Sequence, residues 1–389
     1  MSNLKESNSD TNVIQRNEQG YLDSWPEKDA KIEDEEVKCA EKMINDFRMY
    51  VTHVRSCLEN ERRAISKLPL EDRDLLGDPR KHWTKVAACS VANQKVLESA
   101  ITFAQMALGP DNPIVQASQI HQLRLPDDDR MSKIRSLFKQ MVRDWSSEGS
   151  EERSTCYSRV IRGLEEKFPA VDKRHDIQIL IPGAGLSRLA WDISRLGFST
   201  LANEFDFSMI VMANYLLNSK LKQNSLSIYP YVVERLNSWT YEDQVRKITI
   251  PDIDMSSTQL LTRKNTFGFA MGDFLEVFSD GEQFDAVVSV FFLDTAKNPV
   301  AYIRAMYNLL KPGGIWFNFG PLLYHYADMP ENDSVEIPFE KLLEIIEKIG
   351  FRIEKKEGPG ANPPAFYTRN LNSMLSYSYD CGYFECVKI

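Results

Sequence analysis

Two glycines and an acid in the middle of the chain have the spacing of a site that binds a nucleoside-containing cofactor. Gly183 and Gly185 follow a short apolar run at 177–181, and glycine lets a backbone approach a ligand without interference from a Cβ atom. Glu204 comes 19 residues after Gly185, where an acid that ends the next strand can accept hydrogen bonds from both ribose hydroxyls. The pattern predicts a strand, a glycine turn, a helix from about Ser187 and a second strand that ends in the acid.

The residue that follows this turn distinguishes between two classes of cofactor. A dinucleotide-binding fingerprint has a third glycine, which would stand at position 188, and this chain has Arg188 there. S-adenosylmethionine contains no pyrophosphate and needs only the first part of the motif. The sequence therefore favours S-adenosylmethionine over NAD.

Three downstream segments follow in the order expected for a methyltransferase. We expect residues 267–272 to form a strand that ends at Asp273, which would hold the adenine amino group, while Phe274 packs on the adenine ring. Residues 284–294 are apolar enough for a central buried strand, and they bring Asp294 to the carboxyl edge of the sheet, where ligands bind in open α/β sheets. The Pro-Gly-Gly turn and strand at 309–318 complete a pattern typical of class I methyltransferases. The order of these segments predicts an α/β, Rossmann-like class I fold that uses S-adenosylmethionine.

The composition is that of a protein with a large core and an acidic surface. The chain has 389 residues, is 43% hydrophobic and carries a formal net charge of −9, which disfavours nonspecific binding to nucleic acid or to an anionic membrane. Its 6 cysteines lack CxxC spacing, so no metal site is expected, and no apolar run approaches the ~20 residues of a membrane span. We expect a cytoplasmic enzyme, with a nuclear fraction also allowed.

A helical region is expected to precede the catalytic domain. Residues 1–30 are polar and should form a disordered tail. Apolar residues then recur at helical spacing at about 33–66, 83–106 and 131–145, which predicts a helical N-terminal region over 31–168. This region would cover the catalytic domain and contribute to the cofactor site, and a partner-binding bundle is the alternative.

The Rossmann-like domain is expected over residues 169–389, with an insertion at about 220–265. The chain between Glu204 and Asp273 is much longer than one helix and one strand require. The insertion contains several aromatic residues and would form either a lid over the cofactor or a surface subdomain.

One motif argues against a different class of methyltransferase. Residues 362–366, Asn-Pro-Pro-Ala-Phe, are similar to the Asn-Pro-Pro-aromatic loop with which amino methyltransferases bind adenine, cytosine or glutamine nitrogen. They contain an extra alanine and follow the Pro-Gly-Gly turn, whereas that loop follows the fourth strand, at 291–294 in this chain. The position disfavours an enzyme that methylates nucleic-acid amino groups.

Longer segments of the chain resemble the carnosine N-methyltransferase family. The resemblance extends over roughly residues 40–389 and rests on five motifs, at 139–146, 182–191, 272–274, 291–296 and 320–326. Members of the family transfer a methyl group from S-adenosylmethionine to the imidazole of carnosine, giving anserine. The resemblance implies a small imidazole dipeptide as the substrate, and it leaves a homodimer among the possible oligomeric states.

The matching motifs also imply which residues form the site. The residues expected to bind the cofactor are Gln140, Arg143, Gly183, Glu204, Asp273, Phe274 and Val290, the last standing where the family has a cysteine. The substrate would be bound by Asp294, His325 and a C-terminal tyrosine. Because the tail has one tyrosine fewer than the family run, both Tyr377 and Tyr379 are candidates.

Asp294 has a chemical role that fits methylation of an imidazole. An imidazole has an ordinary pKa near 6.5, so it is largely neutral at pH 7 and no strong base is needed. By accepting the Nε2–H, Asp294 would leave Nδ1 facing the methyl group and would stabilise the imidazolium that forms. The alternatives are a helix N-cap for Asp294 and a hydrogen-bonded loop residue for His325.

The sequence therefore predicts an S-adenosylmethionine-dependent N-methyltransferase that methylates Nδ1 of carnosine to give anserine, and other histidine-containing dipeptides belong to the same expected class of substrate. A histidine methyltransferase that acts on a protein or on another small imidazole is the chief alternative. A noncatalytic cofactor-binding protein that retains the fold is the second.

Overall fold

The computed structural model describes residues 13–15, 34–110, 112–120, 122–256, 264–278, 281, 283–329 and 331–389. An eight-stranded sheet lies at the centre of the fold, in the order β1-β6-β3-β2-β7-β8-β12-β9. Its strands are β1 (Val13–Gln15), β2 (Gln178–Pro182), β3 (Ser199–Glu204), β6 (Phe267–Met271), β7 (Phe284–Val290), β8 (Leu310–Gly320), β9 (Phe351–Glu357) and β12 (Gly382–Lys388). The five strands from β6 to β8 are parallel, and β12 runs antiparallel to β8. The sheet confirms the predicted class I, Rossmann-like fold.

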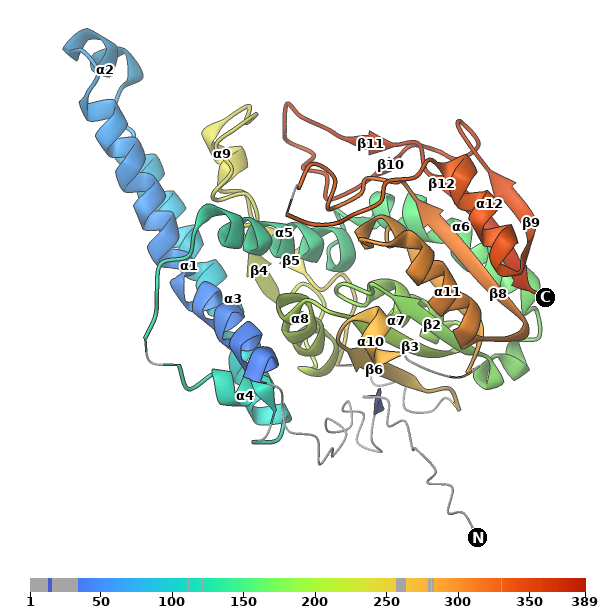
Figure 1. The fold of residues 1–389 in the computed structure, drawn as a ribbon. Helices are drawn as coiled ribbons and strands as arrows, with labels where there is room; N and C mark the ends of the chain where they lie inside the picture. Colours follow the sequence, from blue (N-terminus) through green and yellow to red (C-terminus); the bar gives the residue numbers. More distant parts are fainter. Residues whose placement is uncertain are drawn as a thin grey trace.

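Helices cover both faces of the sheet, as Figure 1 shows. Ile179 and Ile181 of β2 belong to one hydrophobic cluster, whereas Leu180 between them belongs to the other, as expected for side chains that alternate along a strand. The first cluster includes α6 (Ser150–Lys167), α7 (Arg188–Arg195) and α8 (Phe207–Asn218). The second includes α10 (Phe274–Val277), α11 (Pro299–Leu309) and α12 (Phe339–Ile349). Burial on both faces explains why the central strands are continuous apolar runs.

The N-terminal helices form an elongated pair that extends beyond the sheet (Figure 1). Helices α1 (Asp34–Ser66), α3 (Arg80–Ala107) and α5 (Asp128–Trp145) occupy the three segments with helical spacing, and short helices α2 (Leu70–Leu76) and α4 (Pro113–Ala117) lie between them. Both α1 and α3 pack against α8 of the catalytic domain. α6 packs on β7 and β8, so the expected boundary at residue 168 does not separate this helix from the sheet that it covers.

The insertion consists of β4 (Leu226–Ile228), α9 (Tyr241–Gln244) and β5 (Ile248–Ile250), between α8 and β6. β4 and β5 form a small antiparallel sheet, β4 packs on α3, and β5 packs on α5. The carboxylate of Asp252 accepts hydrogen bonds from Arg153 of α6 and Arg188 of α7. These contacts tie the insertion to the helical region and to the start of α7. Residues 257–263 of the insertion lie outside the described residues.

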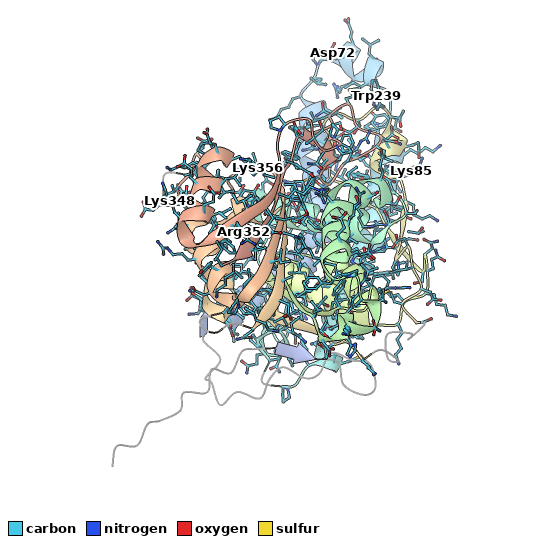
Figure 2. The ribbon with its side chains drawn as sticks, turned by 90° about the vertical axis from the view of Figure 1, so that its right-hand side faces the viewer. Asp72, Lys85, Trp239, Lys348, Arg352 and Lys356 are labelled. Atoms are coloured by element: carbon cyan, nitrogen blue, oxygen red, sulfur yellow. The ribbon has the colours of Figure 1, made fainter. Side chains whose placement is uncertain are left out.

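The two edges of the sheet differ in character. β1 pairs antiparallel with β6 at one edge, and it is the part of the predicted tail that the structure describes, since the other residues of 1–30 lie outside it. β9 forms the opposite edge, and Figure 2 shows Arg352 and Lys356 on it. Such charged side chains disfavour pairing of an edge strand with another chain. Across the described ranges, no helix is long and apolar enough to cross a membrane.

Candidate active site

The predicted site residues lie at the edge of the sheet where the parallel strands end. The glycine turn follows β2, Glu204 ends β3, and Asp273 follows β6. Phe291 to Asp294 follow β7, which is the neighbour of β2 in the sheet. The strand order reverses between β2 and β7, and open α/β sheets bind ligands outside the carboxyl ends of the strands at such a point.

The glycine turn and Glu204 hold each other in place. The Glu204 carboxylate accepts hydrogen bonds from the amides of Gly185 (2.7 Å), Phe205 (2.9 Å) and Asp206 (3.0 Å). Burial raises the pKa of Glu204, while these three amides lower it. Gly183 and Gly185 have φ angles of +63° and +52°, and a Cβ atom on Gly183 would lie 2.4 Å from Cδ2 of Phe292. The local backbone therefore requires glycine at 183, and the hydrogen bonds orient the Glu204 carboxylate toward the glycine turn.

Arg188, at the position of the missing third glycine, anchors the surrounding elements. Its side chain donates to the backbone carbonyl of Asp144 (2.7 Å), to Asp252 of the insertion (2.7 Å) and to Asp192 (3.0 Å). Only 7% of the residue is exposed. The position thus serves to join α5, α7 and the insertion beside the glycine turn.

The C-terminal end of α5 rests on the glycine turn and carries the two polar residues expected there. The indole of Trp145 donates to the carbonyl of Leu186 at 3.0 Å. Arg143 donates to Asp144 and to the Tyr157 hydroxyl, both at 2.9 Å, and Gln140 donates to the Tyr367 hydroxyl. Both side chains are therefore fixed by protein contacts at the border of the site, and their contact with the cofactor stays a prediction.

The other residues expected at the cofactor form an aromatic wall. Asp273 caps α10 by accepting from the Leu275 amide at 2.8 Å. Phe274 is 3% exposed and packs edge-on against Phe292, with 5.5 Å between ring centroids. Val290, the last residue of β7, is half-buried and packs against the larger hydrophobic cluster. The contacts of these side chains with adenine stay predictions.

Asp294 is buried and fixes the segment that contains His325. Its Oδ2 accepts from the Leu323 amide at 3.0 Å, and its carbonyl accepts from the His325 amide at 2.9 Å. Burial raises the pKa of Asp294, whereas the nearby His325 and the Leu323 amide lower it. The N-cap alternative for Asp294 is wrong, because α11 begins at Pro299 and its cap is Asn298.

The structure distinguishes between the two candidate tyrosines. Tyr379, in β11 (Ser378–Tyr379), packs edge-on against Phe291 with 5.9 Å between ring centroids. Burial raises the pKa of the Tyr379 hydroxyl, and the charge of Asp294 raises it further. Tyr377 is 65% exposed and lines a cavity between α5, the insertion and residues 367–377. Tyr379 therefore packs on the segment that contains Asp294, and the carbonyl of Asp294 in turn accepts from the His325 amide, so these three residues belong to one group.

Phe291 and Tyr367 belong to this group, although the sequence reasoning did not identify either of them. Their rings are stacked, with centroids 4.9 Å apart and an interplanar angle of 25°. Phe291 has a φ of +54°, a left-handed backbone that bulky residues rarely adopt outside functional sites. Tyr367 directly follows β10 (Ala365–Phe366), which pairs with β11. Tyr367 directly follows the Asn-Pro-Pro-Ala-Phe segment at 362–366. The sequence pointed to this segment, but its spacing and position excluded it as the substrate loop of amino methyltransferases.

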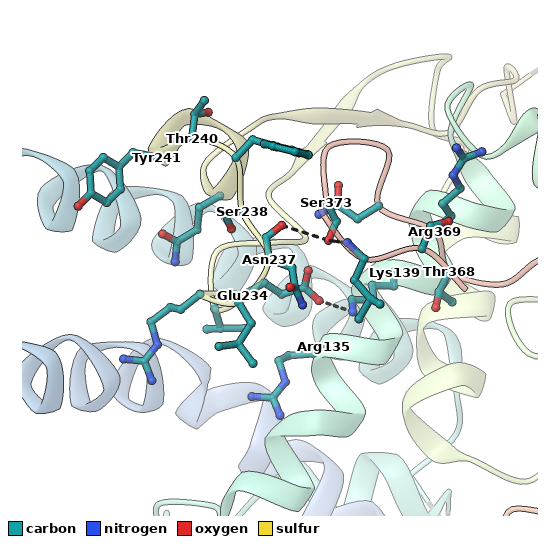
Figure 3. Close-up of a pocket in the computed structure, with 18 of the residues that line it drawn as sticks. Arg135, Lys139, Glu234, Asn237, Ser238, Thr240, Tyr241, Thr368, Arg369 and Ser373 are labelled. Carbon is teal, nitrogen blue, oxygen red and sulfur yellow. Dashed lines mark hydrogen bonds and ion pairs between the residues drawn. The ribbon is translucent and has the colours of Figure 1, made fainter. Parts of the chain in front are cut away.

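A cavity of about 1030 Å³ opens next to Tyr367 (Figure 3). It lies between α5, the insertion and residues 367–377, and Lys139 of α5 forms an ion pair with Glu234 of the insertion at its wall. Its lining includes the cationic side chains of Arg135 and Arg369. Within the described ranges, no cluster of three His, Cys, Asp or Glu side chains is suited to a metal ion.

The chain is similar to a set of proteins that share one description. The family model described as "Carnosine N-methyltransferase" matches residues 120–389. A Mus musculus protein with that name is 34% identical over 88% of this chain and 84% of its own length. A Schizosaccharomyces pombe protein with the same name is 34% identical over 91% of this chain and 96% of its own. Among solved structures, magnesium protoporphyrin IX methyltransferase from Synechocystis PCC 6803 is similar over 65% of this chain and 97% of its own, at 13% identity and a TM-score of 0.34.

Proposed function

Because the chain belongs to the carnosine N-methyltransferase family, we propose that it transfers a methyl group from S-adenosylmethionine to Nδ1 of the carnosine imidazole, giving anserine. The protein is an S-adenosylmethionine-dependent methyltransferase. The nitrogen that is methylated and the product are the parts that we propose. The cytoplasmic or nuclear location and the homodimer stay predictions from the sequence.

The glycine turn and Glu204 suit the nucleoside part of the cofactor. A Cβ atom built on Gly185 would meet no atom within 4 Å, so the turn borders open space that a ligand can enter. Glu204 lies beside this space with its carboxylate oriented by three backbone amides. When bound, S-adenosylmethionine supplies an electrophilic methyl group on a sulfonium. Glu204 would hold the ribose hydroxyls, and Asp273 would hold the adenine amino group.

Asp294 supplies what the imidazole acceptor needs. A carboxylate has about four acceptor positions, and the Leu323 amide occupies one of them, so Asp294 can still accept an imidazole Nε2–H. That hydrogen bond leaves the lone pair on Nδ1 and fixes the ring orientation. The buried negative charge then stabilises the imidazolium product, because charge interactions are stronger where water is excluded.

The packing of Tyr379 and Tyr367 on Phe291, three residues before the buried carboxylate of Asp294, is the observation that carries this proposal. Asp294 is also hydrogen-bonded to the amides of Leu323 and His325, so segments that are distant in sequence meet at the carboxyl end of β7. Tyr379 and His325 would surround the imidazole while Asp294 selects its tautomer. A ring-shaped acceptor that must be held in one orientation explains why aromatic and ionisable side chains gather here.

Methylation assays with labelled S-adenosylmethionine test the proposal directly. We expect carnosine to accept the label, and two-dimensional NMR of the product should place the methyl group on Nδ1, the nitrogen nearer the backbone. Methylation of Nε2 would show that Asp294 does not orient the ring as proposed. Cofactor binding without transfer to any acceptor would instead indicate a noncatalytic protein.

A histidine side chain of a protein is a second candidate acceptor. The cavity beside Tyr367 has a volume of about 1030 Å³, at the upper end of the range for ligand pockets, so it offers room for chain that extends beyond the imidazole. Cell proteins and free histidine therefore belong in the same assay. Labelling of protein with no labelling of carnosine would favour this candidate.

A further inference from the structure

One carboxylate of α6 holds the segment that carries Tyr367. Glu152 is 6% exposed, and it accepts hydrogen bonds from the amide of Thr368 at 2.6 Å and from the amide of Arg369 at 3.1 Å. The same carboxylate lies 3.1 Å from Nε of Arg143 in an ion pair. Two successive amides that converge on one anion fix the backbone between them. Glu152 thus joins α5, α6 and residues 366–370 at a single buried point.

Residues 366–370, which Glu152 holds, include a residue in a strained backbone conformation. Thr368 has a φ of +54°, and a β-branched residue is strained in this left-handed conformation. Phe291, whose ring stacks on the neighbouring Tyr367, also has a φ of +54°. Strained residues persist where the surrounding contacts over-determine them, and they cluster at functional sites. Here both strained residues adjoin the same aromatic stack.

Tyr367 connects the two halves of the proposed active site. Its hydroxyl accepts from Gln140, and its ring centroid lies 4.8 Å from the guanidinium carbon of Arg143, both on the expected cofactor side. Its other neighbour is Phe291, which opens the segment that ends at Asp294. Tyr367 and the three residues after it also line the cavity, and Figure 3 labels Thr368 and Arg369 among them. The position of this segment therefore sets the distance between the cofactor side and the acceptor side.

We propose that Glu152 is a positioning residue, which holds residues 366–370 so that Tyr367 forms the wall of the acceptor site against Phe291. The inference rests on the proposed function for the location of the acceptor. Glu152 acts through Tyr367 and touches neither ligand. Its removal should therefore weaken acceptor binding more than cofactor binding, because Arg143, which also pairs with Glu152, keeps its ion pair with Asp144.

The first test compares Glu152→Gln with the wild-type enzyme. The carbonyl oxygen of a glutamine side chain can accept a hydrogen bond from one of the two backbone N–H groups. Its NH₂ group would face the other backbone N–H, and two donors cannot form a hydrogen bond. We expect the KM for the acceptor to rise about 10- to 100-fold, the range for the loss of a hydrogen bond to a charged group, with the cofactor Kd changed less than about threefold. Glu166→Gln is the matched control, because Glu166 lies on the same helix and is exposed. An unchanged acceptor KM in Glu152→Gln would overturn the proposal.

Two double variants separate positioning from general structural damage. If Glu152 acts through Tyr367, Glu152→Gln should add little to the KM defect of Tyr367→Ala, whereas additive effects would contradict the proposal. Thr368→Gly should partly restore the acceptor KM in the Glu152→Gln background, because glycine adopts a positive φ without support. A double variant with no recovery would show that strain at Thr368 is not what Glu152 controls.

Hydrogen exchange tests the inference independently of the acceptor. The amides of Thr368 and Arg369 should exchange much faster in Glu152→Gln than in the wild type, and they should stay protected in Glu166→Gln. This measurement uses the folded protein with S-adenosylmethionine alone. If carnosine is not methylated but the exchange difference is found, the proposed substrate fails and the positioning role stands. Equal exchange in all three proteins would overturn the positioning role.

Discussion

The burial of Asp294 and its bond to the Leu323 amide make its replacement by asparagine informative. Asparagine keeps the shape and can accept from the same amide, but it loses the charge and does not select one imidazole tautomer. We expect Asp294→Asn to keep the affinity for S-adenosylmethionine and to lose on the order of 10²- to 10⁴-fold in turnover, by analogy with other sites where a carboxylate fixes an imidazole. Calorimetry of cofactor binding and steady-state kinetics check the two parts, and normal turnover would exclude the proposed role.

Asp294→Asn should keep or raise the stability of the folded protein, although it lowers turnover. Because burial raises the folded-state pKa of Asp294, its ionisation opposes folding, and this loss of stability develops as the pH rises from the ordinary pKa of the unfolded chain through the folded value. Below the ordinary pKa, both states bind the proton and the group has no effect. At pH 7, Asp294→Asn should therefore unfold at the same temperature as the wild type or at a higher one. Thermal unfolding at pH 4 and pH 7 measures the effect, and a variant that is less stable at pH 7 would contradict this assignment.

Glu204 combines a ligand role with a structural one, so its replacement should affect both. Glu204→Ala removes the proposed acceptor for the ribose hydroxyls and the carboxylate that holds the Gly185 amide. We expect S-adenosylmethionine binding to weaken by about 1.5–3 kcal/mol, the usual range for hydrogen bonds to a charged group. Calorimetry on the folded variant provides the test. Glu276→Ala, at an exposed position of helix α10, is the control and should bind the cofactor normally.

Among the secondary-structure elements, the insertion is attached in part by one buried carboxylate, which pairs with two arginines outside the insertion. Asp252 bonds to Arg153 and Arg188, and all three side chains are at most 12% exposed. Removal of one partner from a buried ion pair typically costs about 3–5 kcal/mol, so Asp252→Ala should lower the free energy of unfolding by about that amount. Urea denaturation gives the value. Glu344→Ala is the comparison, because its ion pairs with Lys341 and Lys348 lie on the exposed face of α12 and should contribute little to stability.

The periodicity of the sequence was sufficient for most elements, and it was insufficient where the backbone departs from a regular pattern. Apolar spacing located α1, α3, α5 and the buried strands, because burial against a core imposes that spacing. The Pro-Gly-Gly turn was expected before a strand, but it lies inside β8 as a bulge, between Leu310 and Ile315. The helix after β7 was expected to begin near Thr295, whereas the chain first forms a 3₁₀ turn and α11 begins at Pro299. Local spacing does not encode such irregularities.

The positions of candidate site residues that lie at the ends of predicted strands could be predicted from the sequence. The contacts between segments that are distant in sequence could not. Glu204, Asp273 and Asp294 follow strands that the sequence reveals, so the shared sheet edge brings them together. The choice between Tyr377 and Tyr379 needed the packing of β11 against Phe291. Tyr367 and Glu152 lie more than two hundred residues apart in sequence, and only the fold joins them. No pattern within either segment predicts such a contact.

In the molecule as a whole, the helical region and the sheet share one hydrophobic core. A single cluster includes Met43 and Phe47 of α1, Leu97 of α3, Trp145 of α5 and Phe319 of β8. Two regions that were separate domains would each have a core of their own. The polar contacts agree with this arrangement, because Arg188 bonds to α5 and to the insertion beside the glycine turn. The proposed cofactor site therefore lies where the helical region and the sheet meet.

This arrangement predicts how the whole chain should unfold and which ligand should stabilise it. Since α1, α3 and α5 share the core with the sheet, scanning calorimetry should show one cooperative transition. A ligand that binds the folded state stabilises it by mass action, so S-adenosylmethionine at 100 times its Kd should add about 2.7 kcal/mol to the unfolding free energy and raise the temperature of the whole transition. NAD should give no shift, because Arg188 replaces the third glycine of a dinucleotide site. Two separate transitions would show that the helical region folds on its own, and a shift with NAD would overturn the interpretation of Arg188.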